Sequence, residues 1–182
     1  MGRLISIPIF VLPYIFLLSF NLFGENLGAL VVTPIIQKAC DLSNVRDFCY
    51  YVLGSDPSAE FAHLKFNIED IAVQAAYANY SNIHRKVWTI TSNETNSEFR
   101  QLYRKCLHEY NLMKPIFDDL RDTLVFKGDL EKPALDISYH ASNCVIYFMR
   151  APNIPNPIDK DNFDILYFVE LIRSIYYAPL SS

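Results

Sequence analysis

Glycine is scarce in this chain, with only five residues among 182. Folds made of many short strands need glycine at their tight turns, so this scarcity favours helices over a turn-rich sandwich or barrel. The sequence also contains no internal repeat and no low-complexity tract. These absences indicate a folded globular protein built mainly from helices.

Basic residues are outnumbered and do not form clusters. The chain holds 16 Lys and Arg against 20 Asp and Glu, a formal net charge of −4. Proteins that bind nucleic acid need grouped Lys and Arg to neutralise phosphates, so no nucleic-acid partner is expected. A mildly acidic surface instead favours a basic protein partner through electrostatic attraction.

No catalytic motif stands out. The sequence lacks the G-x-S-x-G, H-E-x-x-H and glycine-rich phosphate-binding patterns. Adjacent carboxylates such as Asp118 and Asp119 point about 100° apart on a helix, so they do not flank one substrate bond. The four histidines are scattered along the chain; they are His63, His84, His108 and His140. We therefore expect a protein that presents a surface, not an enzyme, with no cofactor.

The first 24 residues have the features of a secretory signal peptide. Arg3 is followed by a long apolar run and then by small Gly24, with Ala29 as a second candidate cleavage point. A run of this length could also anchor the chain in a bilayer, but two prolines interrupt it and no basic cluster follows. The sequence predicts a signal peptide at 1–24 and one secreted, extracellular domain at 25–182, without membrane contact after cleavage.

Four long segments carry apolar residues at intervals of three and four, the pattern of helices that bury one face. The first predicted helix starts with Asp56 as N-cap and Pro57 in its first turn, and it ends in the polar run 91–97. Its predicted buried stripe is Phe61, Leu64, Ile68, Ile71, Ala75, Ala78, Ile83, Val87 and Ile90.

The other three predicted helices span about 99–124, 130–148 and 160–177, with Gly128 and the proline-rich stretch 151–157 between them. Short connections make consecutive helices antiparallel. The expected fold is therefore all-α: an up-down-up-down four-helix bundle at 56–178. Two shorter helical pieces, 26–39 and 44–53, precede it and form a hairpin within 26–54.

Four cysteines permit three disulfide pairings, and export favours their oxidation. Proximity in the sequence favours Cys40 with Cys49, which leaves Cys106 with Cys144. Residues equally far from the turn between two antiparallel helices lie side by side. The midpoint between Cys106 and Cys144 is residue 125, close to the turn predicted at Gly128. Both of these cysteines lie on apolar stripes, so two antiparallel helices would bring them together across the core.

A zinc site is the alternative use of these cysteines. His140 and Cys144 lie one turn apart on a helix face, and Cys106 and His108 could complete four ligands. Such a site needs reduced thiols, which an extracellular setting disfavours. No metal site is therefore expected.

Two sequons predict N-glycosylation. Asn93 lies in the polar break between the first two bundle helices and is a credible acceptor. Asn79 is embedded in an apolar helical stretch, so a glycan there would require that turn to be exposed.

The four-cysteine frame resembles that of the plant invertase and pectin methylesterase inhibitor family. The stretch from Cys40 to Cys49, followed by LGSDP, is similar to the opening of this family. LYRKCLHEY and NCVIYF resemble its blocks around the third and fourth cysteines. APNIPNP and the apolar helix after it resemble the corresponding loop and last helix of pectin methylesterase inhibitors. The resemblance covers essentially the whole mature chain.

This resemblance implies a four-helix bundle with a helical hairpin, bridged first to second and third to fourth cysteine. It also implies inhibition of an enzyme by one-to-one protein binding. One branch of the family caps pectin methylesterase beside its pectin-binding cleft, and the other blocks acid invertase of the cell wall or vacuole.

This chain departs from the family at two places. Lys132-Pro133 stand in reverse order to the Pro-Lys-Phe motif of many invertase inhibitors, and Leu135-Asp136-Ile137 replaces a common Ser-Ala-Ala run. The leading expectation is an apoplastic pectin methylesterase inhibitor that binds through its second and third bundle helices. The alternatives are an acid invertase inhibitor and a secreted interaction module without inhibitory activity. Binding would depend on pH if His108 or His140 lay in the contact.

Overall fold

The computed structural model describes residues 30–180, so the predicted signal peptide at 1–24 lies outside the described residues. Within residues 30–180 the structure contains six α-helices, one short 3-10 helix and no strand. The α-helices are α2 (Pro34–Asp41), α3 (Arg46–Ser55), α4 (Lys65–Asn93), α5 (Ser97–Val125), α6 (Glu131–Met149) and α7 (Asp159–Tyr177). The all-α prediction is confirmed. None of the helices in this part of the chain is long and apolar enough to cross a membrane.

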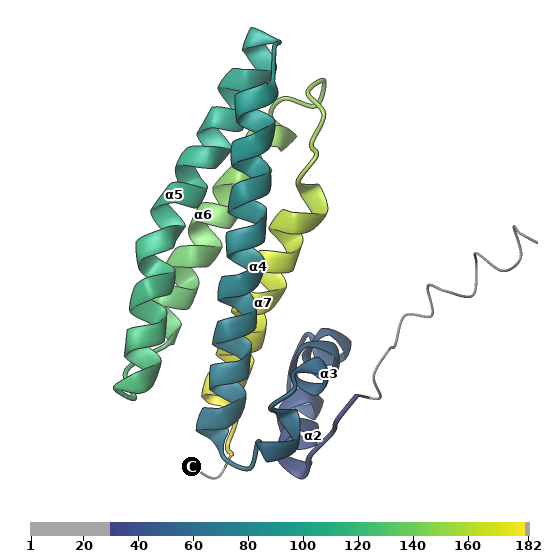
Figure 1. Cartoon of the computed structure of the whole chain (residues 1–182), viewed down its shortest axis with the longest axis vertical. Helices are drawn as coiled ribbons and strands as arrows, with labels where there is room; N and C mark the ends of the chain where they lie inside the picture. Colours follow the sequence, from purple (N-terminus) through teal and green to yellow (C-terminus); the bar gives the residue numbers. More distant parts are fainter. Residues whose placement is uncertain (1–29, 181–182) are drawn as a thin grey trace, which may run out of the picture.

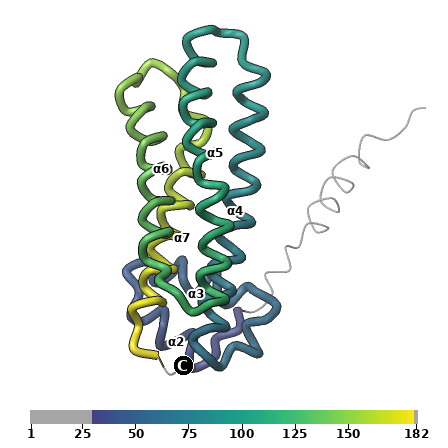
Figure 2. The backbone as a smooth tube through the Cα atoms, turned by 90° about the vertical axis from the view of Figure 1, so that its left-hand side faces the viewer, coloured from purple at the N-terminus to yellow at the C-terminus, as the bar shows by residue number. Residues whose placement is uncertain are grey.

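Helices α4 to α7 form an up-down-up-down bundle (Figure 1). Each helix packs against the next one in the sequence, and α7 closes the ring by packing against α4. The hairpin of α2 and α3 lies beside the lower ends of α4 and α7, as Figures 1 and 2 both show. The predicted combination of a helical hairpin and a four-helix bundle is confirmed.

The bundle core forms where the buried stripes of the four long helices meet. Helices α5, α6 and α7 bury apolar residues at intervals of three and four, close to the predicted pattern. The largest completely enclosed apolar side chains of these helices are Tyr110, Met113, Phe117, Leu120, Ile137, Ile165, Leu171, Ile172 and Ile175.

The start of the first bundle helix was predicted wrongly. α3 continues to Ser55, and Asp56 is extended, with its carboxylate accepting a hydrogen bond from the backbone N–H of Ser58. This is an Asx-turn, which Asp favours because its side chain can accept from the backbone N–H two residues further on. A 3-10 helix follows at Ala59–Phe61, and α4 begins only at Lys65, where the side chain of Asn67 accepts from the N–H of Leu64.

The later start changes which residues of α4 are buried. Phe61 and Leu64 were predicted to be buried but are 68% and 50% exposed, and Ala78 also faces solvent. The observed stripe includes Ile68, Ile71, Ala72, Ala76, Tyr80, Ile83, Val87 and Thr91. Between residues 72 and 80, Ala76 and Tyr80 face the core in place of the predicted Ala75 and Ala78.

Helix α2 also starts later than predicted. Thr33 is its N-cap and Pro34 its first residue, although the prediction placed this helix over 26–39. A residue before proline avoids the helical conformation, and proline suits the first position of a helix. Residues 26–29 lie outside the described part of the chain.

Lys127 and Gly128 end α5 before the turn to α6. Lys127 takes a left-handed conformation with φ of 54°, and the N–H of Gly128 donates to the carbonyl of Thr123 over 2.8 Å. This is the hydrogen bond of a Schellman cap. A Cβ at position 128 would lie 2.8 Å from the methyl carbon of Thr123, so a larger residue would force this side chain to shift.

Both predicted disulfides are confirmed. Cys40 and Cys49 join α2 to α3 with Cα atoms 5.4 Å apart, and Cys106 and Cys144 join α5 to α6 with Cα atoms 4.9 Å apart. All four residues are completely buried. The zinc alternative is wrong in this structure, because both of its cysteines are consumed by the second disulfide.

One polar chain crosses the core beside the second disulfide. The phenol of Tyr80 donates to the backbone carbonyl of Tyr110 over 2.8 Å. The phenol of Tyr110 donates to the side chain of Asn162, and the Asn162 amide lies 3.5 Å from the sulfur of Cys144. These contacts link α4, α5, α6 and α7, and they give the buried side chain of Asn162 partners for both its donor and its acceptor.

Candidate interaction surface

A buried carboxylate lies between α5 and α6. Glu109 is only 5% exposed and follows Cys106 by three residues on the buried side of α5. Its two oxygens accept hydrogen bonds from His140 Nδ1 at 2.7 Å, from the Asn143 amide at 3.4 Å and from the Tyr147 phenol at 2.5 Å. An unpaired buried charge is costly, so these three donors are what allow a carboxylate in this position.

The spacing of the three donors explains why they converge. His140, Asn143 and Tyr147 are separated by three and four residues, so they project from one side of α6 in consecutive turns. That side is turned toward α5 at the height of Glu109. The network therefore fixes the rotation of α6 about its own axis relative to α5. The Cys106–Cys144 disulfide, one turn away, fixes the distance between the two helices.

The protonation states in this network follow from its geometry. Burial raises the pKa of Glu109, but the hydrogen bonds from His140, Tyr147 and Asn143 and the attraction of His140 outweigh it and hold the pKa below the usual range. The hydrogen bond to Glu109, with burial, raises the pKa of Tyr147. The carboxylate is therefore ionised and only accepts, so His140 carries a proton on Nδ1 and Tyr147 keeps its phenolic proton.

The outer side of this network forms a continuous surface. Lys105 lies over the ring of Tyr147, with its Nζ 6.0 Å from the ring centroid. Tyr139 contacts the His140 ring edge-on at 5.3 Å between centroids. We define the α5–α6 face as Lys105, His108 and Leu112 of α5 with Tyr139, His140, Asn143 and Tyr147 of α6.

The α5–α6 face is organised before any partner binds. His140, Asn143 and Tyr147 are held by the buried carboxylate, and Lys105 and Tyr139 pack on two of them. Side chains that are already fixed lose less conformational entropy when they enter an interface. Tyrosine offers a large contact area with few rotatable bonds, which suits it to the centre of a binding surface.

The structure brings two of the four histidines to this face, His108 and His140, on which a pH dependence of binding would depend. His140 is bound to Glu109, and exposed His108 lies one residue before Glu109 on α5. His84 instead contacts the side chain of Asn111 at 2.7 Å between α4 and α5, and His63 is exposed in the link before α4. Within residues 30–180 no three His, Cys, Asp or Glu side chains are placed to hold a metal ion.

Sequence reasoning missed Glu109, Asn143 and Tyr147. Glu109 follows Cys106 by three residues and precedes Met113 by four, so it falls within the apolar stripe of its helix. A charged residue at such a position signals a buried partner. The partners themselves depend on how α6 is rotated against α5, which the stripes alone do not specify to within one residue.

The two predicted glycosylation sites differ in environment. Asn93 is exposed at the last position of α4, and Thr95 of its sequon is exposed too. Asn79 is half-buried within α4, its side-chain oxygen is enclosed without a hydrogen-bond partner, and the hydroxyl of Ser81 donates to the carbonyl of Tyr77. Only the surroundings of Asn93 offer a glycan free access, and glycosylation stays a prediction.

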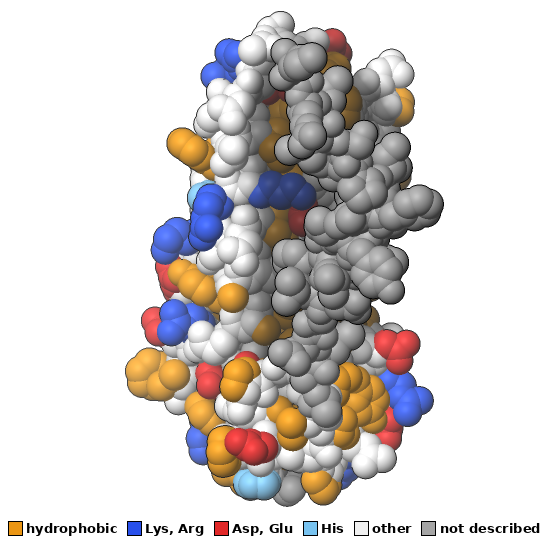
Figure 3. Space-filling model, turned by 45° about the vertical axis from the view of Figure 1, so that its right-hand side comes forward, with side chains coloured by type: hydrophobic (Ala, Val, Ile, Leu, Met, Phe, Trp, Pro, Cys, Tyr) orange, Lys and Arg blue, Asp and Glu red, His pale blue; other side chains and the backbone are white. Residues whose placement is uncertain are grey.

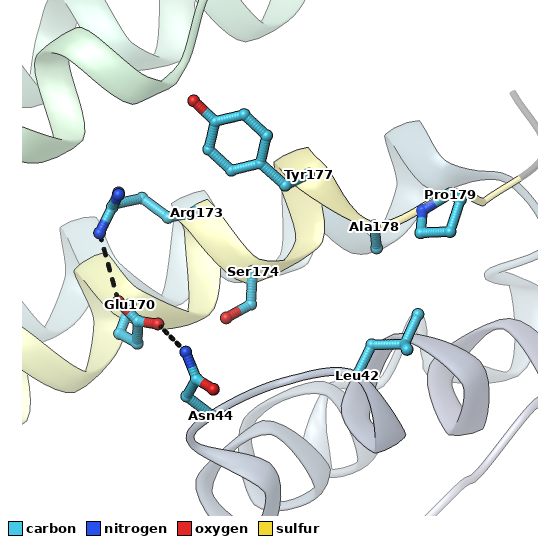
Figure 4. A pocket seen from close by; sticks show the side chains of 8 residues that line it. All are labelled: Leu42, Asn44, Glu170, Arg173, Ser174, Tyr177, Ala178 and Pro179. Atoms are coloured by element: carbon cyan, nitrogen blue, oxygen red, sulfur yellow. Dashed lines mark hydrogen bonds and ion pairs between the residues drawn. The ribbon is translucent and has the colours of Figure 1, made fainter.

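Apart from the α5–α6 face, a concave region lies between the hairpin and α7. It has a volume of about 430 Å³ and is lined by Leu42, Asn44, Glu170, Arg173, Ser174, Tyr177, Ala178 and Pro179 (Figure 4). The amide of Asn44 donates to Glu170 over 2.8 Å, and Arg173 lies 3.4 Å from both Glu170 and Glu131. Arg173 is thus paired with carboxylates of α7 and α6, and the hydrogen bond from Asn44 to Glu170 attaches the hairpin to α7.

Hydrophobic side chains are also exposed near the lower end of the molecule. Figure 3 shows them there with acidic and basic groups between them. They include Leu42, Tyr51, Phe61 and Leu64 of the hairpin and the link that follows it. Unlike the α5–α6 face, these side chains are not held by a buried polar network in the part of the chain that the structure describes.

Comparison with known proteins finds no family model that matches the chain and no similar curated protein.

Proposed function

We propose that the protein is a secreted inhibitor of pectin methylesterase in the plant cell wall and that it binds the enzyme through the α5–α6 face. Its activity in this proposal is one-to-one protein binding, without catalytic residues or a cofactor of its own. The spacing of the four cysteines, which resembles that of the invertase and pectin methylesterase inhibitor family, supports this choice of target.

The observation that carries the proposal is the network under the α5–α6 face. An inhibitor must offer a surface that keeps its shape against an enzyme, since flexible contacts lose affinity to ordering entropy. Glu109 orients three side chains of this face, and the Cys106–Cys144 disulfide clamps the two helices beneath it. A rigid and partly aromatic surface of this kind suits tight protein binding.

Secretion is supported by the cysteines and by the predicted signal peptide. Both disulfides are buried parts of the fold, and bridges of this kind form in oxidising compartments. Cleavage after residue 24 would remove one basic residue, leaving 15 basic and 20 acidic groups and a net charge of −5. Attraction to a basic enzyme would then weaken as salt is added.

The direct test is an assay of methanol release. Purified, oxidised protein is added in increasing amounts to pectin methylesterases acting on pectin, and we expect the rate to fall to a plateau near one equivalent. Protein whose disulfides have been reduced and alkylated is the control and should not inhibit. Undiminished rates at excess protein, with every esterase tried, would reject the proposal.

A parallel assay separates the two alternatives. Sucrose hydrolysis by acid invertase is measured under the same conditions, and we expect no effect. Inhibition of invertase but not of esterase would replace the proposed target by invertase. Lack of inhibition in both assays would favour a secreted interaction module that does not inhibit.

A further inference from the structure

Helix α6 carries a second apolar stripe, which faces solvent. Leu135, Tyr139, Ile146 and Met149 follow one another at intervals of four, seven and three, so they share one side of the helix. This side lies opposite the buried stripe. Tyr139 and Met149 are 64% and 73% exposed. Exposed apolar residues that lie together in one patch are typical of interaction sites. We call these four residues the outer stripe.

The outer stripe has nearly the same pattern in both directions along the helix. Its centre lies between Ser142 and Asn143, and Tyr139 and Ile146 are equally far from this point on opposite sides. Leu135 and Met149 form the next pair outward. A second copy of α6 in the antiparallel direction would therefore place Tyr139 against Ile146 of that copy, and Leu135 against its Met149.

Charges on one edge of the stripe fit the same arrangement. Asp136 and Arg150 are also placed nearly symmetrically about the centre, and both lie on the edge nearer α5. Asp136 is also paired at 3.4 Å with Lys132 of its own helix, on the same exposed edge. A two-fold axis through the centre would bring Asp136 of each copy opposite Arg150 of the other. In a parallel alignment the α5 edges of the two copies would lie on opposite sides of the contact, so neither charge pair would form. The small side chain of Ser142 at the centre permits the helices to approach closely.

We propose that the protein forms a two-fold symmetric dimer in which the outer stripes of two α6 helices pack antiparallel. The position of α6 permits this, because it lies at an outer edge of the bundle (Figure 2). One helix pair buries less surface than a standard protein interface, so the dimer dissociates easily, with a dissociation constant on the order of micromolar or weaker.

This dimer and the proposed enzyme complex share Tyr139. Self-association would therefore compete with binding at the α5–α6 face, and the monomer would be the form that binds an enzyme. The inference itself does not depend on the proposed function, because the oligomeric state is measured with the protein alone.

The charge pairs provide the sharpest test. The molar mass of the mature protein is measured by analytical ultracentrifugation over increasing concentrations, and we expect it to rise from monomer toward dimer. Asp136→Arg and Arg150→Asp each put like charges together, and each should weaken the dimer about tenfold. The double variant exchanges the charges across the two-fold axis and should bind itself more tightly than either single variant, although the arginine introduced at position 136 then lies beside Lys132. A wild type that stays monomeric at every concentration, or a double variant as weak as the single ones, would overturn the proposal.

Two further variants test the stripe and its register. Tyr139→Asp should abolish self-association, whereas Phe163→Asp, at an exposed aromatic residue on α7, should leave it unchanged. Ser142→Cys lies next to the two-fold axis and should form a disulfide-linked dimer on mild oxidation. Ser92→Cys, exposed on α4, is the control for random collision. Equal cross-linking of the two cysteine variants, or equal effects of the two Asp variants, would contradict the arrangement.

Discussion

The phenol of Tyr110 donates a hydrogen bond to the side-chain oxygen of Asn162 over 2.6 Å in the middle of the bundle. Neither residue has any exposed surface. Burial, followed by the nearby Asp161 and Tyr80, raises the pKa of Tyr110, so the phenol keeps its proton and acts as a donor at neutral pH. The pair connects α5 to α7 at the depth of the second disulfide.

Removal of this phenolic hydroxyl should destabilise the protein. Tyr110→Phe leaves the buried oxygen of Asn162 without a donor, and we expect the free energy of unfolding to fall by about 1–3 kcal/mol. Urea unfolding followed by circular dichroism measures the change. Tyr50→Phe is the matched control, because its hydroxyl bonds Asp41 at the surface and should cost less than about 0.5 kcal/mol. Equal losses in the two variants would show that the interior hydrogen bond contributes nothing.

The buried carboxylate predicts a particular dependence of stability on pH. The pKa of Glu109 is lower in the folded protein than in the unfolded chain, where it lies near the usual value of about 4.3. The folded state therefore gains stability from this group at pH values above about 4.3, and it loses that gain as the pH falls further toward the folded pKa.

Glu109→Gln should remove this contribution. Near neutral pH we expect the variant to be less stable by about 1.5–3 kcal/mol, the range for hydrogen bonds to a charged group. Below about pH 4 the difference from wild type should shrink, because protonation weakens the same bonds in the wild type. Unfolding free energies measured from pH 7 to pH 3 test this. Glu98→Gln, at the exposed start of α5, is the control; a difference for Glu109→Gln that does not vary with pH would contradict the ionised network.

The two disulfides should contribute unequally to stability. The bridge between Cys106 and Cys144 spans 38 positions and that between Cys40 and Cys49 spans nine. Restriction of the unfolded chain is worth about 4 kcal/mol for the longer loop and about 3 kcal/mol for the shorter one. Paired replacement of each bridge by alanine, followed by urea unfolding, tests the order. A larger loss from the Cys40–Cys49 pair would contradict the view that the second bridge braces the bundle.

Glycosylation is expected at one sequon only. When the chain is expressed through a eukaryotic secretory pathway, Asn93→Gln should lower its mass by one glycan, because Asn93 and Thr95 are exposed. Asn79→Gln should leave the mass of the glycoprotein unchanged apart from the substitution. Mass spectrometry before and after enzymatic deglycosylation decides the matter, and a glycan found on Asn79 would mean that this turn of α4 opens during maturation.

The parts of the fold that could be predicted are those marked by apolar residues that recur every three or four positions. Three helices and both disulfides followed from apolar spacing and from cysteines such as Cys106 and Cys144 that lie on the stripes. The region around Asp56 could not be predicted, because Asp can either start a helix as its N-cap or form an Asx-turn. The sequence does not show which of the two packs better against the hairpin.

The candidate surface was less predictable. The sequence predicts contact through the second and third bundle helices, with a pH dependence if His140 takes part, but it does not single out Glu109, one charge among apolar neighbours. Its donors, Asn143 and Tyr147, become recognisable only when the rotation of α6 against α5 is known. A shift of one residue in that rotation would turn all three donors away from the carboxylate.

The most direct test of the proposed function compares two substitutions of similarly exposed apolar residues. Leu112 lies in the α5–α6 face, and Phe163 lies on α7, across the bundle from α5. In titrations of pectin methylesterase, Leu112→Asp should weaken inhibition at least about tenfold, as expected for a charge buried in an interface. Phe163→Asp should inhibit as well as the wild type. Equal inhibition by the two variants, or a loss confined to Phe163→Asp, would contradict binding through the α5–α6 face.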